Sequence, residues 1–280
     1  MRAPVRCATA PIGVFDSGIG GLSVLRALMA ELPRERFVYW ADNAHAPYGE
    51  RDVGHVMQRA LHVGQRLRDM QGAKALVIAC NTATAAAVEA LRDAHADWPI
   101  VGVEPPLKPA ALHTRSGRVG VLATRGTLAS ARYAALRDAL ARAHGTLFVD
   151  QACDGLAAAI EAAAAAGNAA PAEALLARHL AALGPLGQAA AQIDTVVLGC
   201  THYPLLLQAL RQLAGPQVML IDPGVPVARQ TRRLLDGAGL LNRGDAPSAR
   251  LSLLATGEFQ SLQAAAARWL GVKTPVEAVD

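Results

Sequence analysis

Short apolar runs alternate with longer runs of helical spacing along almost the whole chain. Three of the apolar runs, at Ile12–Phe15, Ala75–Ala79 and Thr195–Gly199, have the length of a buried strand. Each is followed by small or polar residues and then by apolar positions that recur with a helical period, as in Leu22–Leu32. Because neighbouring parallel strands are joined by helices, this order predicts an α/β protein with mostly parallel sheets flanked by helices.

The rest of the chain continues this alternation. The pattern predicts strands at 37–40, 100–103, 119–122, 147–150, 218–221 and 250–254, and helices at 53–70, 81–96, 130–143, 204–213, 227–235 and 260–270. The alanine-rich tract from Leu156 to Leu183 predicts two helices that separate at Gly167–Asn168. Three prolines, Pro105, Pro106 and Pro109, indicate that the chain crosses there from one lobe to another.

Two segments of the first half of the chain recur in the second half. Ile12–Ser17 resembles Val119–Thr124, and the strand that ends at Cys80 resembles the strand that ends at Cys200. Chance similarity of short apolar runs is the alternative, but the order and the spacing of the two pairs agree. The repeat therefore predicts two pseudo-symmetric lobes with an active site in the cleft between them.

The first expected lobe is built from two separate segments of the chain, and the second from one. Residues 1–107 together with residues 217–280 are expected to form the first lobe, which carries Asp16 and Cys80. Residues 108–216 are expected to form the second lobe, which carries Cys200 and His202.

The two recurring cysteines stand where a strand ends and a helix begins. That place is the carboxyl edge of a parallel sheet, where α/β folds bind their ligands. A helix N-terminus lowers the pKa of a thiol, so we expect Cys80 and Cys200 to supply two bases that face one substrate. His202 follows Cys200 by two residues and could polarise or protonate it. A buried structural role is the alternative, and the shared context of the two cysteines argues against it.

The other two cysteines lack this context, so Cys7 and Cys153 are expected to be structural. The four cysteines are widely spaced, without a C-x-x-C pair or a metal-binding spacing. Free thiols in such a chain are typical of a cytoplasmic protein.

The glycine-rich turn Asp16–Gly21 offers backbone N–H groups and the Ser17 hydroxyl at the start of a helix, an arrangement that suits a carboxylate. As a dinucleotide fingerprint it is poor, because Ser23 replaces the third small residue and no acidic residue ends a second strand at the required distance. Asp16 could accept a hydrogen bond from a substrate ammonium group or support a thiol. Capping of the turn is its alternative role.

Composition removes several classes of function. The net charge is +4, from 27 basic and 23 acidic residues, and no dense basic block with aromatic residues indicates a nucleic-acid interface. The segment Met1–Pro11 has no apolar core and is not a secretory signal, and no apolar run is long enough to predict a membrane span. Lys74 and Lys108 lack the context of a pyridoxal phosphate lysine.

Motifs spread over nearly the whole chain resemble those of one enzyme family, the cofactor-independent glutamate racemases of the aspartate/glutamate racemase superfamily. The matching segments are Val14–Val24, Asp42 with Pro47–Gly49, Cys80–Ala83, Thr124 with Gly126–Thr127, Gly199–Pro204, Thr256–Gly257 and Arg268–Gly271. The resemblance implies interconversion of L- and D-glutamate without pyridoxal phosphate, a metal or another cofactor. It also implies a homodimer that supplies D-glutamate for peptidoglycan synthesis in the bacterial cytoplasm.

The same resemblance implies a role for each residue of the catalytic set. Cys80 would remove the α-proton of D-glutamate and Cys200 that of L-glutamate, while the opposite thiol returns a proton. Asp16 would assist Cys80, whereas His202 and Glu161 would assist Cys200. The substrate contacts carried over from the family are Asp16, Ser17, Tyr48, Gly49, Asn81, Thr82, Thr124, Thr127, Thr201 and His202.

One position departs from the family pattern, since Asp154 follows Cys153 where the family often has proline. Two other interpretations remain open from the sequence. A racemase of aspartate or hydantoin would use the same fold, and a non-catalytic binding protein would keep the cleft without the chemistry.

Overall fold

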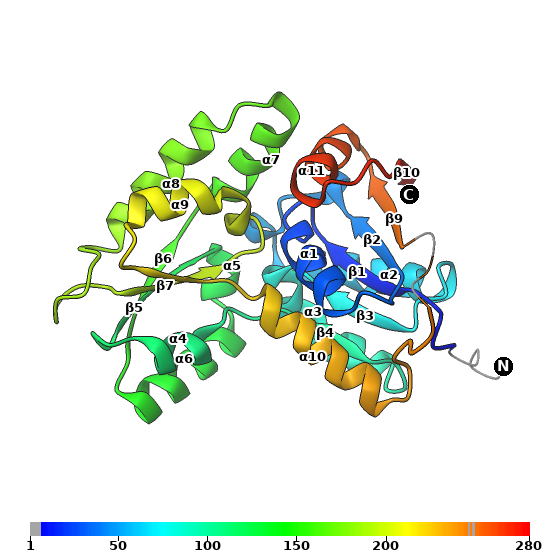
Figure 1. Cartoon of the computed structure of the whole chain (residues 1–280), viewed down its shortest axis with the longest axis horizontal. Coiled ribbons are helices and arrows are strands. Elements are labelled where there is room, and N and C mark those ends of the chain that lie inside the picture. The colour runs from blue at the N-terminus through cyan, green and yellow to red at the C-terminus, as the bar shows by residue number, and fades with distance from the viewer. Residues whose placement is uncertain (1–6, 246, 248–249) are drawn as a thin grey trace.

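Two parallel sheets, each covered by helices on both faces, make up the computed structural model, which describes residues 7–245, 247 and 250–280 (Figure 1). The first six residues of the N-terminal segment considered above lie outside the described residues. The prediction of an α/β fold with parallel sheets is confirmed.

The first sheet has six strands, and its centre is built from the N-terminal part of the chain. Their spatial order is β10 (Val276–Val279), β9 (Leu251–Thr256), β2 (Phe37–Ala41), β1 (Ile12–Asp16), β3 (Ala75–Ile78) and β4 (Ile100–Gly102). One face packs on α1 (Leu22–Glu31), α10 (Gly224–Gly237) and α11 (Gln260–Leu270), and the other on α2 (Val53–Asp69) and α3 (Asn81–Ala94). All five residues of β1 are buried, as expected for a central strand covered on both faces.

The second sheet has four strands, which come from one continuous part of the chain. Their order is β6 (Leu147–Ala152), β5 (Arg118–Ala123), β7 (Thr195–Gly199) and β8 (Met219–Ile221). Helices α7 (Leu156–Ala166), α8 (Ala170–Ala182) and α9 (Leu207–Ala214) cover one face, and α4 (Leu107–His113) and α6 (Ala131–His144) cover the other. The alanine-rich tract is therefore split at Gly167–Asn168, as its pattern predicts.

The internal repeat is visible in the order of the strands. The order β2-β1-β3-β4 of the first sheet corresponds to β6-β5-β7-β8 of the second. In register, Ile12 pairs with Ala75 as Val119 pairs with Thr195, so the two cysteine strands hold equivalent places beside the two turn strands. The carboxyl ends of β3 and β7 carry Cys80 and Cys200.

The expected return of the chain to the first lobe at residue 217 is too early. Strand β8 pairs with β7, Thr195 opposite Met219, and so belongs to the second sheet. The chain returns with α10, whose apolar side packs on α1. The boundary was misplaced because a three-residue strand carries no mark of the sheet that it joins.

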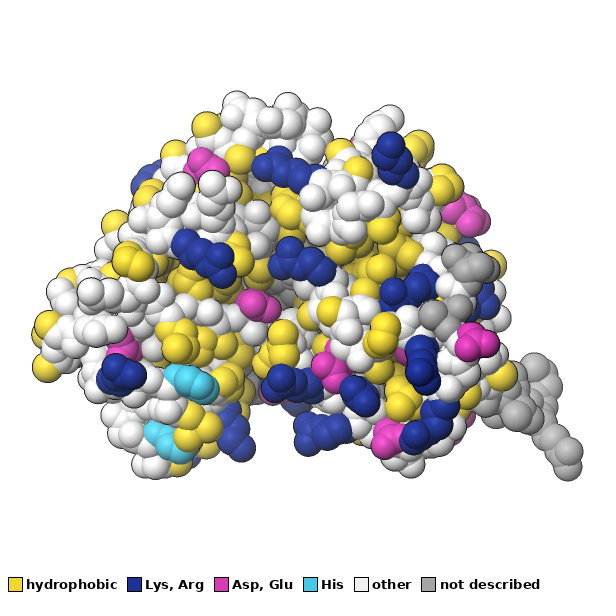
Figure 2. Space-filling view, in the orientation of Figure 1, with side chains coloured by type: hydrophobic (Ala, Val, Ile, Leu, Met, Phe, Trp, Pro, Cys, Tyr) yellow, Lys and Arg dark blue, Asp and Glu magenta, His cyan; other side chains and the backbone are white. Residues whose placement is uncertain are grey.

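The two halves share part of their core. One continuous apolar cluster runs from the α1 face of the first sheet to the α7 and α8 face of the second, and α7 contacts α11 across the junction. Basic side chains are scattered over both halves of the face shown in Figure 2, with acidic ones among them. Within the described residues, none of the helices combines the length and the apolar character that a membrane crossing requires.

Candidate active site

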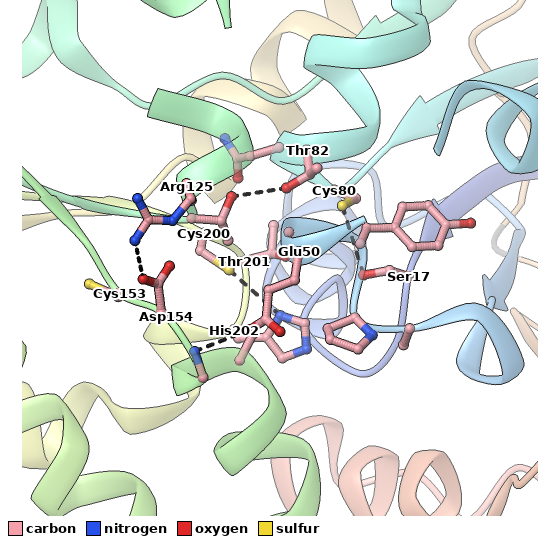
Figure 3. A pocket seen from close by; sticks show the side chains of 18 of the residues that line it. Ser17, Glu50, Cys80, Thr82, Arg125, Cys153, Asp154, Cys200, Thr201 and His202 are labelled. Carbon is pink, nitrogen blue, oxygen red and sulfur yellow. Dashed lines mark hydrogen bonds and ion pairs between the residues drawn. The ribbon is translucent and has the colours of Figure 1, made fainter. Parts of the chain in front are cut away.

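A pocket lies between the carboxyl edges of the two sheets and contains both repeated cysteines (Figure 3). Cys80 and Cys200 enter it from the ends of β3 and β7. The pocket is lined by Ser17, Ala46, Pro47, Tyr48, Gly49, Glu50, Cys80, Asn81, Thr82, Thr124, Arg125, Cys153, Asp154, Gly155, Ala157, Glu161, Cys200, Thr201 and His202. Both lobes therefore contribute to one surface, as the strand-end positions of the cysteines predict.

The first thiol is held at a helix start. Cys80 is the N-cap of α3, and its Sγ accepts a hydrogen bond from the N–H of Ala83 at 3.4 Å. The same sulfur lies 3.8 Å from Oγ of Ser17 in the glycine-rich turn after β1. These contacts fix the sulfur between the turn and the helix.

Burial overturns the expected acidity of this thiol. The helix N-terminus was expected to lower its pKa, but burial raises the pKa of Cys80 to about 12, and the nearby Asp16 carboxylate acts in the same direction. The hydrogen bond from Ala83 opposes the rise and is the smaller effect. The prediction of a lowered Cys80 pKa is therefore wrong, because desolvation of a thiolate outweighs one helix N–H group.

The second thiol sits in a chain of polar contacts. Sγ of Cys200 lies 3.7 Å from Nδ1 of His202, and Nε2 of His202 lies 2.7 Å from Oε1 of Glu161 on α7. Burial acts against the charged imidazole, but its bonds with Cys200 and Glu161 outweigh this and raise the pKa of His202 well above its ordinary value. His202 thus lies between the sulfur of Cys200 and the carboxylate of Glu161, and both favour its charged form.

The glycine-rich turn makes room for this chain of contacts. A Cβ on Gly18 would lie 2.0 Å from Oε1 of Glu161, and a Cβ on Gly20 would lie 2.3 Å from Nδ1 of His202. The N–H of Ile19 donates a hydrogen bond of 2.8 Å to the same Glu161 oxygen. The glycines therefore permit the close approach of side chains from the other lobe. This role differs from that of the glycines in a dinucleotide fingerprint, which make room for a pyrophosphate.

Asp16 is fully buried behind the pocket wall and joins the two lobes. Its carboxylate accepts hydrogen bonds from the N–H of Gly18 at 3.0 Å and from Oγ1 of Thr201 at 3.3 Å. Burial raises the pKa of Asp16 to about 6, although the positive charge of His202 and the N–H of Gly18 act against the rise. A carboxyl group with this pKa changes its charge close to neutral pH.

The lobes also meet at the mouth of the cleft. Oγ1 of Thr82 lies 3.0 Å from Oγ1 of Thr124, which lies 3.0 Å from Oγ1 of Thr127. Thr124 also caps the short helix α5 (Arg125–Leu128). The N–H of Gly155 donates to Glu50 across the cleft at 3.3 Å.

Asn81 offers polar atoms that no protein group uses. Its side chain is 4% exposed, and among the described residues neither Nδ2 nor Oδ1 has a hydrogen-bond partner. A buried amide left without partners costs free energy, so these atoms are available to a polar ligand.

Most of the predicted site residues converge on the pocket, and two lie behind it. Asp16 and Thr127 are buried and do not line the surface, although each bonds to a residue that does. The structure places Tyr48, Gly49 and the residue pair Asn81–Thr82 on one wall.

Several lining residues were not predicted. Cys153, expected to be structural, is buried and lines the pocket, while Cys7 is exposed and does not line it. Arg125 and Asp154 form an ion pair at the pocket edge. Their proximity to the Thr124 and Cys153 motifs was the signal that could have found them.

Neither Lys74 nor Lys108 lines the pocket. In the part of the chain that the structure describes, no group of three or more His, Cys, Asp or Glu side chains is arranged to hold a metal ion. Lys74 is buried in an ion pair with Glu35, away from the pocket. Glu35 also accepts a hydrogen bond from the N–H of Asn242, so the pair joins distant segments of the first lobe.

Comparison with known families gives one match over most of the chain. Residues 12–231 match the model of the Asp/Glu/Hydantoin racemase family. Glutamate racemase of Pseudomonas syringae pv. tomato is 50% identical over 239 residues, which cover 85% of this chain and 82% of that protein. Glutamate racemase of Ectopseudomonas mendocina is 46% identical over 267 residues, covering 95% and 97%.

Solved structures give the same result. Glutamate racemase isoform RacE1 from Bacillus anthracis superposes with a TM-score of 0.81 at 33% identity, covering 97% of each chain. Escherichia coli glutamate racemase, in complex with L-glutamate and the activator UDP-MurNAc-Ala, has a TM-score of 0.79 at 30% identity, covering 96% of this chain and 98% of that one.

Proposed function

Because the chain belongs to the Asp/Glu/Hydantoin racemase family, we propose that it interconverts L- and D-glutamate by proton transfer between two thiols. The observation that carries the proposal is the pair Cys80 and Cys200, which reach one pocket from equivalent strand ends of two lobes. Inversion at one carbon needs a base on one face and an acid on the other, and two such thiols can supply both.

The proton steps use no group from outside the chain. From L-glutamate, the thiolate of Cys200 removes the α-proton, and the thiol of Cys80 delivers its proton to the opposite face. D-glutamate follows the reverse path, so each turnover exchanges the roles of the two sulfurs. A carbanion of this kind is very basic, and the buried pocket must stabilise the negative charge that develops.

The helpers differ between the two thiols. An imidazolium of His202, 3.7 Å from Sγ of Cys200, can offset negative charge on that sulfur, and Glu161 holds the ring in place. Asp16 carries its charge near Cys80. Because it is buried behind the pocket wall, it would act on that thiol through its charge and on the pocket through Thr201, which donates a hydrogen bond to it, and not by direct contact with the substrate. The proposed roles predict that Glu161→Gln lowers activity less than His202→Asn, since only the latter removes the group beside the sulfur.

The substrate contacts are proposed from the same surface. Asn81, Thr82 and Thr201 present amide and hydroxyl groups for one carboxylate, with Ser17 beside Cys80. Tyr48, Gly49 and Thr124 line the pocket where the lobes meet, and Thr127 lies behind them with its hydroxyl bonded to that of Thr124.

Solvent exchange tests the proposal directly. Each enantiomer of glutamate is incubated with the protein in deuterated water, and deuterium at the α-carbon is followed by NMR while circular dichroism follows inversion. Exchange and inversion with glutamate, and neither with aspartate or a hydantoin, is the expected result. Absence of exchange with both enantiomers of glutamate would leave a non-catalytic binding protein as the better interpretation.

We also propose that the protein acts as a homodimer in the bacterial cytoplasm, where D-glutamate feeds peptidoglycan synthesis. Light scattering after gel filtration should give the mass of two chains. Rescue of a D-glutamate auxotroph by the expressed gene tests the cellular role, and growth with the Cys80→Ser variant would contradict it.

A further inference from the structure

Asp42 is a buried carboxylate beside the pocket that the proposed proton transfer does not use. It follows β2 directly, its side chain is fully buried, and its backbone N–H donates a hydrogen bond of 3.0 Å to the carbonyl oxygen of Asp16. A buried charge is costly unless hydrogen bonds and an opposite charge compensate it.

Four hydrogen bonds from three separate segments converge on this carboxylate. Arg59 of α2 donates from Nε at 3.0 Å and from Nη2 at 2.8 Å. The Tyr48 hydroxyl donates at 2.5 Å, and Oγ1 of Thr256, at the end of β9, donates at 3.1 Å. Asp42 and Thr256 both belong to the segments that match the racemase family in sequence, yet neither lines the pocket.

The network keeps Asp42 ionised without leaving an uncompensated charge beside the pocket. Burial by itself would raise the pKa of Asp42, but the hydrogen bonds from Arg59 and Tyr48 outweigh it and lower the pKa. The positive charge of Arg59, 2.8 Å away, offsets the carboxylate. Because Arg59 neutralises the charge of Asp42, the buried carboxylate repels an anionic substrate in the pocket less than an unpaired one would.

The hydroxyl of Tyr48 donates its hydrogen bond to Asp42, so this proton is not available to a ligand in the pocket. The Tyr48 ring packs edge-on against Phe15 with 6.1 Å between ring centroids. Gly49, the next residue, lies so close to the other lobe that a Cβ there would be 2.9 Å from Cβ of Thr124. A small shift of the Tyr48 segment would therefore change the width of the cleft.

We propose that Asp42, paired with Arg59, is a positioning residue that anchors the Tyr48–Gly49 wall and so sets the affinity for the substrate. The proposal rests on the proposed racemization of glutamate in the same pocket. It separates binding from chemistry, because Cys80 and Cys200 are held by β3, α3 and β7 and not by this network.

The test compares three changes in the network. Tyr48→Phe removes one hydrogen bond and leaves the Asp42–Arg59 pair intact, so KM for glutamate is expected to rise about fivefold, equivalent to ~1 kcal/mol. Asp42→Leu removes the acceptor for all four donors and should raise KM further, with kcat changed less than about twofold. Asp42→Asn keeps an oxygen for Tyr48 and should recover part of the lost affinity.

The second lobe offers a matched control. Tyr133 and Arg137 both bond to Asp150, forming the same Tyr–Asp–Arg combination on α6 and β6, and none of the three lines the pocket of the two cysteines. Tyr133→Phe should lower thermal stability without moving KM or kcat. If Tyr48→Phe also changes only stability, or if kcat falls while KM is constant, the positioning role is wrong.

A second readout separates this proposal from the proposed function. The dissociation constant of D-glutamate is measured by calorimetry for the wild-type chain and for Tyr48→Phe and Asp42→Asn. A wild-type chain that binds glutamate without racemizing it contradicts the proposed function, and the loss of affinity in the variants still supports the anchor. Equal dissociation constants for all three chains would overturn the anchor even if racemization is normal.

Discussion

The two lobes present the same thiol at the same strand end, but they surround it with opposite charges. Cys80 lies near the buried carboxyl group of Asp16, whereas Cys200 lies beside the imidazole of His202. At the end of β5, where the repeat places the counterpart of Asp16, the chain has Ala123 and no carboxylate. The two lobes share the strand order of the repeat but differ in the polar groups around each thiol.

This difference favours one resting protonation state for Cys80. Burial and the Asp16 charge favour a protonated Cys80, which is the acid that the proposed mechanism needs when L-glutamate is the substrate. Each helper also bonds across the cleft, since Asp16 accepts from Thr201 and Glu161 accepts from the N–H of Ile19. In the proposed mechanism, the chemistry of either thiol therefore depends on contact with the opposite lobe.

The largest expected effect comes from removing one thiol at a time. Cys80→Ser and Cys200→Ser should each lower racemization by about 10²–10⁴-fold, because a hydroxyl is a far weaker acid and base. In deuterated water, Cys200→Ser should exchange the α-hydrogen of D-glutamate alone, and Cys80→Ser that of L-glutamate alone. Exchange of both enantiomers by either variant would break the assignment of one face to each lobe.

The charge near Cys80 gives the next largest effect. Asp16 has a pKa of about 6 in the folded protein against an ordinary value of 3.8, so its ionisation costs stability. That cost is absent below about pH 4, grows as the pH rises and is complete above pH 6. Asp16→Asn should thus raise the free energy of unfolding at pH 8 by about 2–3 kcal/mol while lowering activity.

Urea unfolding at pH 8 and at pH 4 measures this effect, and the gain should vanish at the lower pH. Asp194 of the second lobe is the control, because its pKa is shifted in the opposite direction to that of Asp16. Hydrogen bonds from Thr114, Arg115 and Ser116 overcome its burial and lower its pKa, so Asp194→Asn should lose stability at pH 8. Equal responses of the two variants would refute the contrast.

A smaller effect is expected where the first lobe makes room for the second. Gly20→Ala places a methyl group 2.3 Å from Nδ1 of His202, so the imidazole must shift away from Cys200. Overpacking of this kind costs about 1–3 kcal/mol, and kcat should fall about tenfold. Gly237→Ala, with no atom within 4 Å of the added Cβ, should leave kcat unchanged.

The smallest expected effect lies at the mouth of the cleft. Thr82 and Thr124 share one hydrogen bond of 3.0 Å between the lobes, so Thr82→Val and Thr124→Val should be coupled by at most about 1 kcal/mol in a double-mutant cycle on kcat/KM. Full additivity of the two changes would show that this contact does not link the lobes during turnover.

The strand and helix pattern was predictable because buried strands and amphipathic helices leave a periodic trace in the sequence. Several short elements left no such trace, and two of them show why. Helix α4 contains Pro109 in its first turn, where the missing N–H is harmless, and its prolines were taken for a crossing alone. Strand β10 has four residues at the edge of the first sheet, too few for an alternation to stand out.

The residues of the site also fall into those that the local sequence predicts and those that only the packing of the fold brings together. Cys80, Cys200 and His202 were predictable from strand-end positions that local sequence encodes. Arg59 was not, because its partner Asp42 lies on another element and only the packing of α2 on the sheet brings them together. The raised pKa of Cys80 was also hidden, since desolvation depends on how completely the lobes enclose the sulfur.

The place of β9 in the first sheet has a consequence for synthesis of the chain on the ribosome. A nascent chain that ends before Leu251 already holds every strand of the second sheet, yet β2 has only β1 as a neighbour. The exposed edge of β2 is covered only when Leu251–Thr256 has been added. The lobe that is begun first is therefore completed last, and with it the wall that Asp42 and Thr256 hold together.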